Sequence, residues 1–191
     1  MRDDRPLSVV ANGAQYVKAG QSDTPDVIQV SYEYRNWRMS YEGIQLSTFG
    51  AGPRIPGGRV PYGANAPHAR PHGEAFYGTK GTIFSDRVGY EVFPADAGEG
   101  ATEPSVEPRS VAGADRTDLH VLDFIECMRS RNMPLADVDV GHRSTVACLM
   151  ANISYKLGGL KLAWDPDRER FDDVRANDLI DRPARRPWDL I

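Results

Sequence analysis

The stretch IQVSYEYRNWRMSYE, residues 28–42, decides the fold class. Apolar or aromatic residues alternate in it with polar ones on both sides of Arg35-Asn36. A period of two, rich in β-branched and aromatic residues, is typical of half-buried strands. The two residues between the runs predict a β-hairpin, because Asn36 tolerates the positive φ that a tight turn needs. One face of this hairpin is apolar and aromatic, and the other is polar.

Further strands are predicted on both sides of this hairpin. Residues 7–18 form a partner strand that breaks at Asn12-Gly13, and residues 76–93 form short strands around two glycine-containing turns. Residues 50–74 contain six glycines and five prolines, which predict a long surface loop. Residues 94–116 are poor in apolar residues and are predicted to be a connector.

The second half of the chain predicts helices. Asp115 or Thr117 caps the first, and Asp139 caps a second that stops at Gly158-Gly159. Residues 160–164 predict a strand, residues 174–180 a short helix, and the proline-containing tail an extended segment. The apolar positions at helical spacing are Val121, Leu122, Ile125 and Met128 in the first helix, and Val146, Leu149, Met150, Ile153 and Leu157 in the second.

Strands first and helices later predict an α+β fold. We expect an open, largely antiparallel β-sheet with helices packed on one face. The length of 191 residues fits a single domain over 1–191, with the loop at 50–74, the connector at 94–116 and the tail at 181–191. If the uncovered sheet face is flat and aromatic, we expect a second copy of the chain to bury it.

The composition excludes several classes of protein. The chain is 40% hydrophobic and 26% charged, with a formal net charge of −4, so it is neither disordered nor basic enough for non-specific nucleic-acid binding. No apolar run approaches the roughly 18 residues of a membrane span. Cys127 and Cys148 are too few for a disulfide scaffold. A cytoplasmic protein with no nucleic-acid or membrane partner is expected, and an export signal on a longer precursor stays open.

Most catalytic and metal motifs are missing from the sequence. It has no Gly-x-Gly-x-x-Gly or Walker loop, and residues 78–82 have the wrong spacing for a phosphate cradle and predict a turn. His68 and His72 have the spacing of two ligands on one helical turn, but Pro67 and Pro71 disfavour a helix there and no third ligand is near, so metal binding is not expected. The acidic run over 165–172 lacks the glycine and the glutamate of a calcium loop. Cys127 and Cys148 are predicted to be small core residues.

The segment GHRST, residues 141–145, is the most suggestive of a site. If it opens a helix, its free backbone N–H groups favour an anion. His142 exchanges protons near neutral pH, and Arg143 forms paired hydrogen bonds to carboxylates or phosphates. The alternative is that both residues cap the helix and tether it to a neighbouring loop. Arg38, with Glu42 on the polar strand face, is either a site residue or plain surface. The substrate-binding candidates are therefore His142, Arg143 and Arg38.

Several motifs in order resemble one family. They are FYGTKGTIF at 76–84 with GYEV at 89–92, HVLDFIECMRSR at 120–131, the GHRST helix, LAWDP at 162–166, and the Arg-Pro and Pro-Trp pairs of the tail. Together they resemble the C-terminal domain of the glucose–fructose oxidoreductase / inositol dehydrogenase / MocA (Gfo/Idh/MocA) superfamily. The match is close over 75–93 and 118–190 and weaker before.

The resemblance implies a bacterial NAD(P)-dependent oxidoreductase that acts on sugars or cyclic polyols. Members have an N-terminal Rossmann domain, with the cofactor loop and a Glu-Lys-Pro motif. A sheet-and-helix domain follows, which covers the nicotinamide and mediates oligomerisation. The Asp-x-x-x-His motif of its start is not found here, since Arg116 and Val138 stand four residues before His120 and His142. No catalytic or cofactor-binding residue is carried over.

The resemblance therefore predicts a substrate-binding and oligomerisation domain without its Rossmann domain. We expect it to bind a sugar or polyol, to bind no NAD or NADP alone, and to pair with a second copy through the sheet or with a separate Rossmann-domain chain. One alternative is a non-catalytic sugar-binding or scaffold module. Another is a complete enzyme that uses His142 and Arg143 in unrelated acid–base chemistry.

Overall fold

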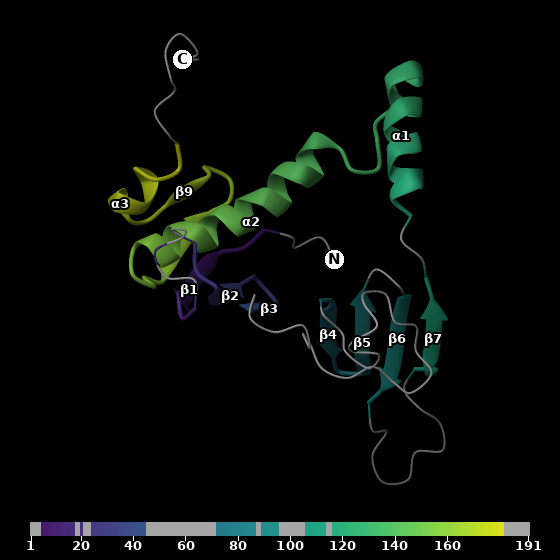
Figure 1. Cartoon of the computed structure of the whole chain (residues 1–191), viewed down its shortest axis with the longest axis horizontal. Coiled ribbons are helices and arrows are strands. Elements are labelled where there is room, and N and C mark those ends of the chain that lie inside the picture. Colours follow the sequence, from purple (N-terminus) through teal and green to yellow (C-terminus); the bar gives the residue numbers. More distant parts are fainter. Residues whose placement is uncertain are drawn as a thin grey trace. The chain divides into compact units, whose positions relative to one another are not determined.

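The computed structural model describes residues 5–17, 20, 24–44, 72–86, 89–95, 106–113 and 116–181. The chain divides into two compact units, Met1–Leu46 with Met133–Ile191, and Ser47–Asn132. All the described strands pair antiparallel, in open sheets of five and four strands with few helices (Figure 1). The α+β fold predicted from the sequence is confirmed, and the single-domain organisation stays a prediction.

The first unit contains the five-stranded sheet, in the order β3-β2-β1-β8-β9. Its strands are β1 (Ser8–Ala14), β2 (Val27–Glu33), β3 (Arg38–Ile44), β8 (Leu162–Asp165) and β9 (Arg170–Phe171). The predicted break at Asn12-Gly13 is wrong, because both residues stay in register with β2. Glycine is required at position 13, since a Cβ atom there would lie 2.8 Å from the carbonyl oxygen of Val27.

The β2–β3 hairpin turns at Arg35-Asn36, as predicted. The Tyr34 N–H donates to the Trp37 carbonyl at 3.0 Å, and the two rings stack with their centroids 3.8 Å apart. Asn36 does not adopt the expected positive φ, since among the described non-glycine residues only Arg131 and Glu169 do. The stacked rings and the Tyr34 bond close this turn without a left-handed residue.

Helix α2 (Val138–Lys156) packs against β1. The Asp137 carboxylate accepts from the Val140 N–H at 2.8 Å, so the helix cap lies two residues before the predicted Asp139. Asp137 has the extended backbone of a capping residue, whereas Asp139 already lies inside the first turn. The helix ends as predicted, with Gly158 and Gly159 at φ 76° and 83°.

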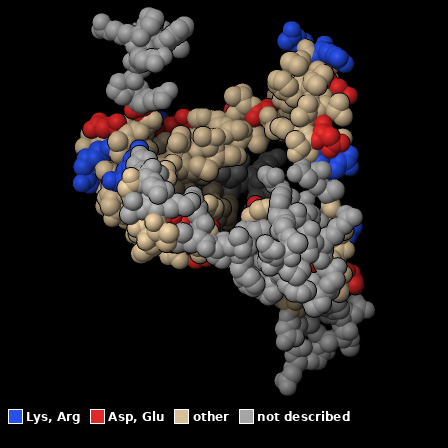
Figure 2. Space-filling model, in the orientation of Figure 1, with Lys and Arg blue, Asp and Glu red and all other residues tan. Residues whose placement is uncertain are grey.

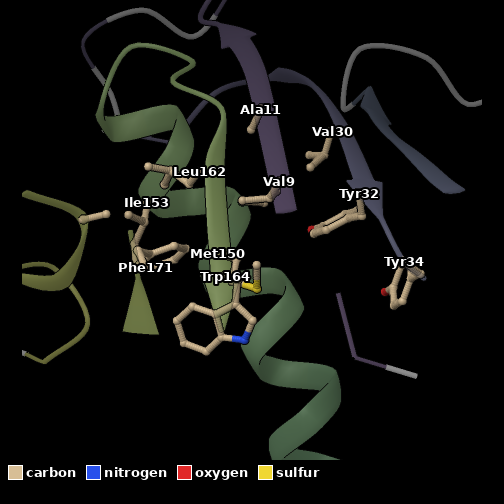
Figure 3. Close-up of a cluster of buried hydrophobic side chains, with 12 residues drawn as sticks. Val9, Ala11, Val30, Tyr32, Tyr34, Met150, Ile153, Leu162, Trp164 and Phe171 are labelled. Carbon is tan, nitrogen blue, oxygen red and sulfur yellow. The ribbon is translucent and has the colours of Figure 1, made fainter. Parts of the chain in front are cut away.

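The core of the first unit lies between α2 and the sheet (Figure 3). Met150 and Ile153 of the predicted stripe are buried there, but Leu149 is half exposed, which corrects its assignment to the core. Buried Ser154 joins the two layers: its Oγ accepts from the Ala11 N–H at 2.9 Å and donates to the Leu160 carbonyl at 2.7 Å. The other buried apolar residues are Val9, Ala11, Val30, Tyr32, Tyr34, Ala151, Leu162, Trp164, Phe171 and Ala176.

The second unit contains the four-stranded sheet, in the order β4-β5-β6-β7. Its strands are β4 (Glu74–Gly78), β5 (Gly81–Asp86), β6 (Gly89–Pro94) and β7 (Arg109–Ala112). The turn predicted around residues 78–81 is confirmed. Strand β7 lies inside the expected connector and corrects it, because its four residues are too few to give a periodic signal. Most of the expected loop at 50–74 lies outside the described residues, and Glu74 already belongs to β4.

Two helices differ from their predicted bounds. Helix α1 (Thr117–Ser130) has Arg116 at its N-cap with no side-chain capping bond, so Thr117 is not the cap, and Asp115 lies outside the described residues. None of its residues is buried, and Leu122 is half exposed. Helix α3 (Val174–Asn177) ends earlier than predicted, because residues 178–180 form a turn. The tail at 182–191 lies outside the described residues.

Candidate functional site

A groove of about 510 Å³ runs beside α2 in the first unit. We call it the α2 groove. Its floor contains Met150, Ile153, Trp164 and Phe171, and its walls come from α2, the β8–β9 hairpin and the segment after α3. Figure 2 shows a band of uncharged side chains over α2, with charged groups at its margins. The charged or titratable residues that line the groove are His142, Lys156, Arg168, Glu169, Arg170 and Asp181.

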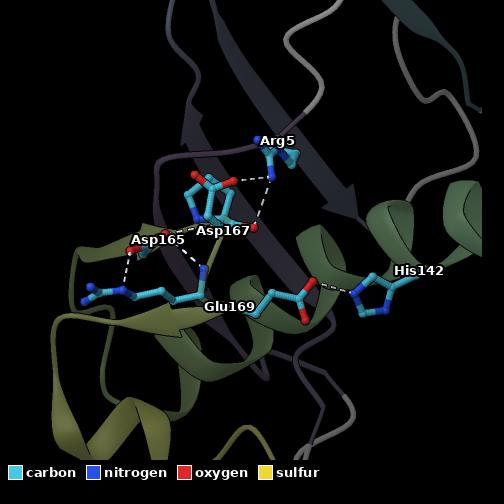
Figure 4. A network of polar contacts seen from close by, with 7 residues as sticks. Arg5, His142, Asp165, Asp167 and Glu169 are labelled. Atoms are coloured by element: carbon cyan, nitrogen blue, oxygen red, sulfur yellow. Dashed lines mark hydrogen bonds and ion pairs between the residues drawn. The ribbon is translucent and has the colours of Figure 1, made fainter.

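His142 contacts the β8–β9 turn across one end of this groove (Figure 4). Its Nε2 lies 2.6 Å from Oε1 of Glu169, and both side chains are about half exposed. Glu169 holds a left-handed backbone at φ 52°, which is uncommon for a residue with a Cβ atom. This contact matches the tethering role that the sequence left open for His142.

The same turn is fixed at two further points. The Asp165 carboxylate accepts the N–H groups of Asp167 and Arg168 at 2.9 and 3.1 Å, which hold the pKa of Asp165 below its usual value. Arg5 Nη1 reaches Asp167 Oδ1 at 2.8 Å and the Pro166 carbonyl at 3.2 Å. The acidic run therefore bonds to protein groups. The described residues contain no cluster of three or more side chains suited to a metal ion.

The segment at 141–145 does not open the helix. Because α2 begins at Val138, the Gly141 N–H already bonds to the Asp137 carbonyl at 3.0 Å. The Thr145 hydroxyl donates back to the Gly141 carbonyl at 2.8 Å. Arg143 Nε donates to the Asp139 carbonyl at 3.3 Å, on its own helix. The free N–H groups expected here for an anion are therefore absent from this described segment, and His142 and Arg143 would act through their side chains.

Arg38 lies on the other face of the sheet, in a polar network around Glu33. Carboxylate oxygens of Glu33 lie 3.3 Å from Arg38 Nη2, 3.4 Å from Lys161 Nζ and 3.2 Å from Ser8 Oγ. The hydrogen bond from Lys161, followed by that from Ser8, lowers the pKa of Glu33. On the same face, Gln29 Nε2 donates to Glu42 Oε1 at 3.0 Å. We call Ser8, Gln29, Glu33, Arg38, Glu42 and Lys161 the polar sheet face.

The three sequence candidates do not share one site. His142 and Arg143 are on α2, which covers the apolar face, while Arg38 alternates with the core-facing residues of β3 and lies on the opposite face. Glu33 and Glu169 were missed as site residues. The alternation in β2 could have paired Glu33 with Arg38, but nothing local predicts that Glu169 meets His142, 27 residues away.

Neither cysteine belongs to the core. Cys148 is exposed and Cys127 is only partly buried, which corrects the assignment of both as core residues. Partial burial, and then the nearby Asp123 carboxylate, raise the pKa of the Cys127 thiol. A raised pKa keeps a thiol protonated and poorly nucleophilic, so Cys127 is not suited to covalent chemistry.

The described residues do not form a Rossmann cradle for a nicotinamide dinucleotide. A Rossmann cradle needs a parallel strand followed by a glycine-rich turn and a helix. The strands of the described segments pair only antiparallel, and α1 and α2 follow a connector and a loop. No described residue is therefore assigned to NAD or NADP. No helix of the described part is long and apolar enough to cross a bilayer.

The described segments form an α+β fold with open antiparallel sheets. Residues 101–190 match the family model described as "Oxidoreductase family, C-terminal alpha/beta domain", GFO_IDH_MocA_C2. Over these residues the chain is similar to the C-terminal domain of the Gfo/Idh/MocA oxidoreductases, as its motifs predict.

Two solved structures share the fold. One is a provisionally assigned oxidoreductase from Thermotoga maritima, with a TM-score of 0.54 and 16% identity over 82% of this chain. The other is a provisionally assigned oxidoreductase from Klebsiella pneumoniae, with a TM-score of 0.51 and 12% identity over 92% of this chain. The chain spans 40% and 47% of the lengths of these proteins. No curated protein matches it.

Proposed function

We propose that this chain is the substrate-binding and oligomerisation domain of an NAD(P)-dependent oxidoreductase that acts on a sugar or polyol. The observation that carries the proposal is the family match over residues 101–190. In such enzymes the cofactor supplies the hydride chemistry, and the protein supplies binding and orientation. The chain would present the substrate to a Rossmann domain, shield the transfer from water, and not catalyse alone.

The polar sheet face is the surface best equipped for a polyol. It combines a guanidinium, an ammonium, an amide and two carboxylates, which donate to and accept from vicinal hydroxyls. Arg38 and Lys161 both contact Glu33, and their side chains remain 74% and 65% exposed. The Arg38–Glu33 and Lys161–Glu33 pairs therefore keep N–H donors that are accessible to a ligand. His142 and Arg143 are proposed as secondary contacts from α2.

The proposed oligomer uses the four-stranded sheet. Phe76 and its partner Ile83 lie on one face, and Tyr77 and Phe93, which both pair with Thr82, lie on the other. These residues leave large apolar surface, since Phe76 is 50% exposed and Tyr77 79%. A second copy of the chain is the natural occupant of such a surface. In the first unit α2 already covers the apolar sheet face, which leaves the polar one. Tyr77→Lys should lower the mass measured by light scattering, whereas Tyr16→Lys, a similarly exposed control at 72%, should not.

The substrate proposal is tested by nuclear magnetic resonance titration of the chain with hexoses and cyclic polyols. We expect saturable shifts at Gln29, Arg38 and Lys161, and their loss in Arg38→Ala. Arg129→Ala, an exposed arginine on α1, is the matched control. If no sugar or polyol shifts these signals, the substrate proposal is wrong.

The partner proposal needs a separate experiment. The tagged chain should retain a Rossmann-domain protein from the lysate of its source, and the pair should oxidise a polyol with NAD or NADP. Saturable sugar binding with no such protein retained would instead identify a non-catalytic sugar-binding module. A cytoplasmic location is part of the same proposal, and the two free cysteines support it.

A further inference from the structure

The α2 groove differs from the polar sheet face because it has an apolar floor. Its α2 wall runs from His142 to Lys156, a separation of about 21 Å at the rise of an α-helix. Two exposed leucines, Leu149 and Leu179, line the groove together with its apolar floor. A long apolar channel with polar ends fits a ligand with an elongated apolar body, and it offers few partners to a polyol.

The floor of the groove is built from packed side chains. Trp164 and Phe171 meet edge to face with their centroids 4.7 Å apart, and both are at least nine-tenths buried. Phe171 is fixed in turn, because its N–H donates to Asn177 Oδ1 at 2.8 Å and its carbonyl accepts from Asn177 Nδ2 at 2.9 Å. The groove is therefore preformed, which limits the cost of ordering it on binding.

The charge around the groove favours an anion. Lys156, Arg168 and Arg170 are counted as positive at pH 7, while the chain as a whole carries −4. Among the described residues, Lys156 and Arg170 form no ion pair, and Arg168 approaches Asp165 only at 3.8 Å. Two carboxylates, Glu169 and Asp181, also line the groove, so three positive groups stand against two negative ones. A local excess of positive charge in an acidic chain attracts anionic ligands.

From these observations we propose that the α2 groove binds a free organic carboxylate with an elongated apolar body. Its apolar body would lie over Trp164 and Phe171, between Leu149 and Leu179. Its carboxylate would pair with Arg170 or Lys156. This site is separate from the polar sheet face, so it stands or falls independently of the sugar proposal.

The proposal is tested by calorimetric titration of the full chain with decanoate, below its micelle concentration. Decyltrimethylammonium and decyl glucoside carry the same apolar body with a positive or an uncharged head. We expect saturable decanoate binding, at least about fivefold tighter than that of the cationic analogue, and weaker as salt rises. Equal affinity for the two charged heads, or no saturable decanoate binding, would overturn it.

Two pairs of variants locate the site. Leu149→Gln should weaken decanoate binding about fivefold or more, while Leu122→Gln, with the same 50% exposure on α1, should leave it unchanged. Arg170→Gln should weaken decanoate binding about two- to fivefold without affecting decyl glucoside, and Asp181→Asn should strengthen it. All four residues are partly or wholly exposed, and circular dichroism checks that the variants fold. If Leu122→Gln weakens binding as much as Leu149→Gln, the ligand is not in the α2 groove.

Discussion

Nε2 of His142 on α2 lies 2.6 Å from Oε1 of Glu169 in the β8–β9 turn, and both residues line the α2 groove. The two residues are 27 positions apart, and Glu169 has a left-handed backbone. Because Arg5 and Asp165 fix the other side of the same turn, the pair completes a polar frame around it. These contacts hold the turn that carries Arg168 and leads into Arg170.

The His142–Glu169 pair should contribute little to stability by itself. Both side chains are about half exposed, so solvent screening limits such a pair to about 0–1 kcal/mol. We expect His142→Gln and Glu169→Gln each to lower the free energy of unfolding slightly in urea titrations. The double variant should lose less than the sum of the two. Fully additive losses would mean that the residues are not coupled.

Ser154 should matter much more to stability. Its hydroxyl accepts the Ala11 N–H in the middle of β1, and it is completely buried. Ser154→Ala leaves that N–H without a partner, which costs about 1–3 kcal/mol in the free energy of unfolding. The control is Ser144→Ala, because Ser144 is exposed on the same helix and donates only to the Val140 carbonyl. A loss in Ser144→Ala equal to that in Ser154→Ala would contradict this role.

The two aspartates at the start of α2 should differ. Asp137→Ala removes the side-chain cap on the Val140 N–H and should cost about 1 kcal/mol. Asp139→Ala removes only a favourable charge in the first turn, worth about 0.3–1 kcal/mol. Chemical denaturation of both variants makes the comparison. A larger loss of unfolding free energy for Asp139→Ala would show that Asp139, as the sequence predicts, is the helix cap.

The Asp173–Arg175 pair predicts a pH dependence at the start of α3. Arg175 Nη2 lies 2.7 Å from the Asp173 carboxylate, and this bond lowers the pKa of Asp173 to about 2. Because its folded pKa lies below the ordinary value of about 3.9, Asp173 stabilises the fold above about pH 4. That contribution fades as the pH falls toward 2.

The matching experiment compares Asp173→Asn with the parent chain as a function of pH. Asp173→Asn should be less stable at neutral pH, and the difference should disappear near pH 2. Carboxyl carbon shifts followed by nuclear magnetic resonance give the pKa directly. A midpoint for Asp173 near 3.9 or above would contradict the depression.

Local patterns predicted the strands and helices that have strong periodicity. The alternation over residues 28–42 gave β2 and β3 with their turn, and the glycine pair at 158–159 gave the end of α2. Strand β7 was missed, because four residues pairing with β6 carry too little pattern. The cap of α2 was misplaced because Asp137 and Asp139 are equally good capping residues, and only the backbone at Asp137 distinguishes them.

The candidate sites depended on tertiary contacts that no local pattern contains. Arg38 was found from the polar side of an alternating strand, but Lys161, which meets the same carboxylate, comes from the far end of the chain. The helix N-terminus was expected near Gly141, although the helix had already begun at Val138. Glu169 has no motif of its own, and its contact with His142 spans 27 positions of sequence.

The most direct test of the proposed function is calorimetric titration of the purified chain with NADH, NADPH, and a panel of hexoses and cyclic polyols. We expect saturable heat from at least one polyol, its loss in Arg38→Ala, and no binding of either nucleotide. Tight binding of NADH or NADPH by the chain alone, or no binding of any sugar or polyol, would contradict its assignment as the substrate-binding domain of a two-domain oxidoreductase.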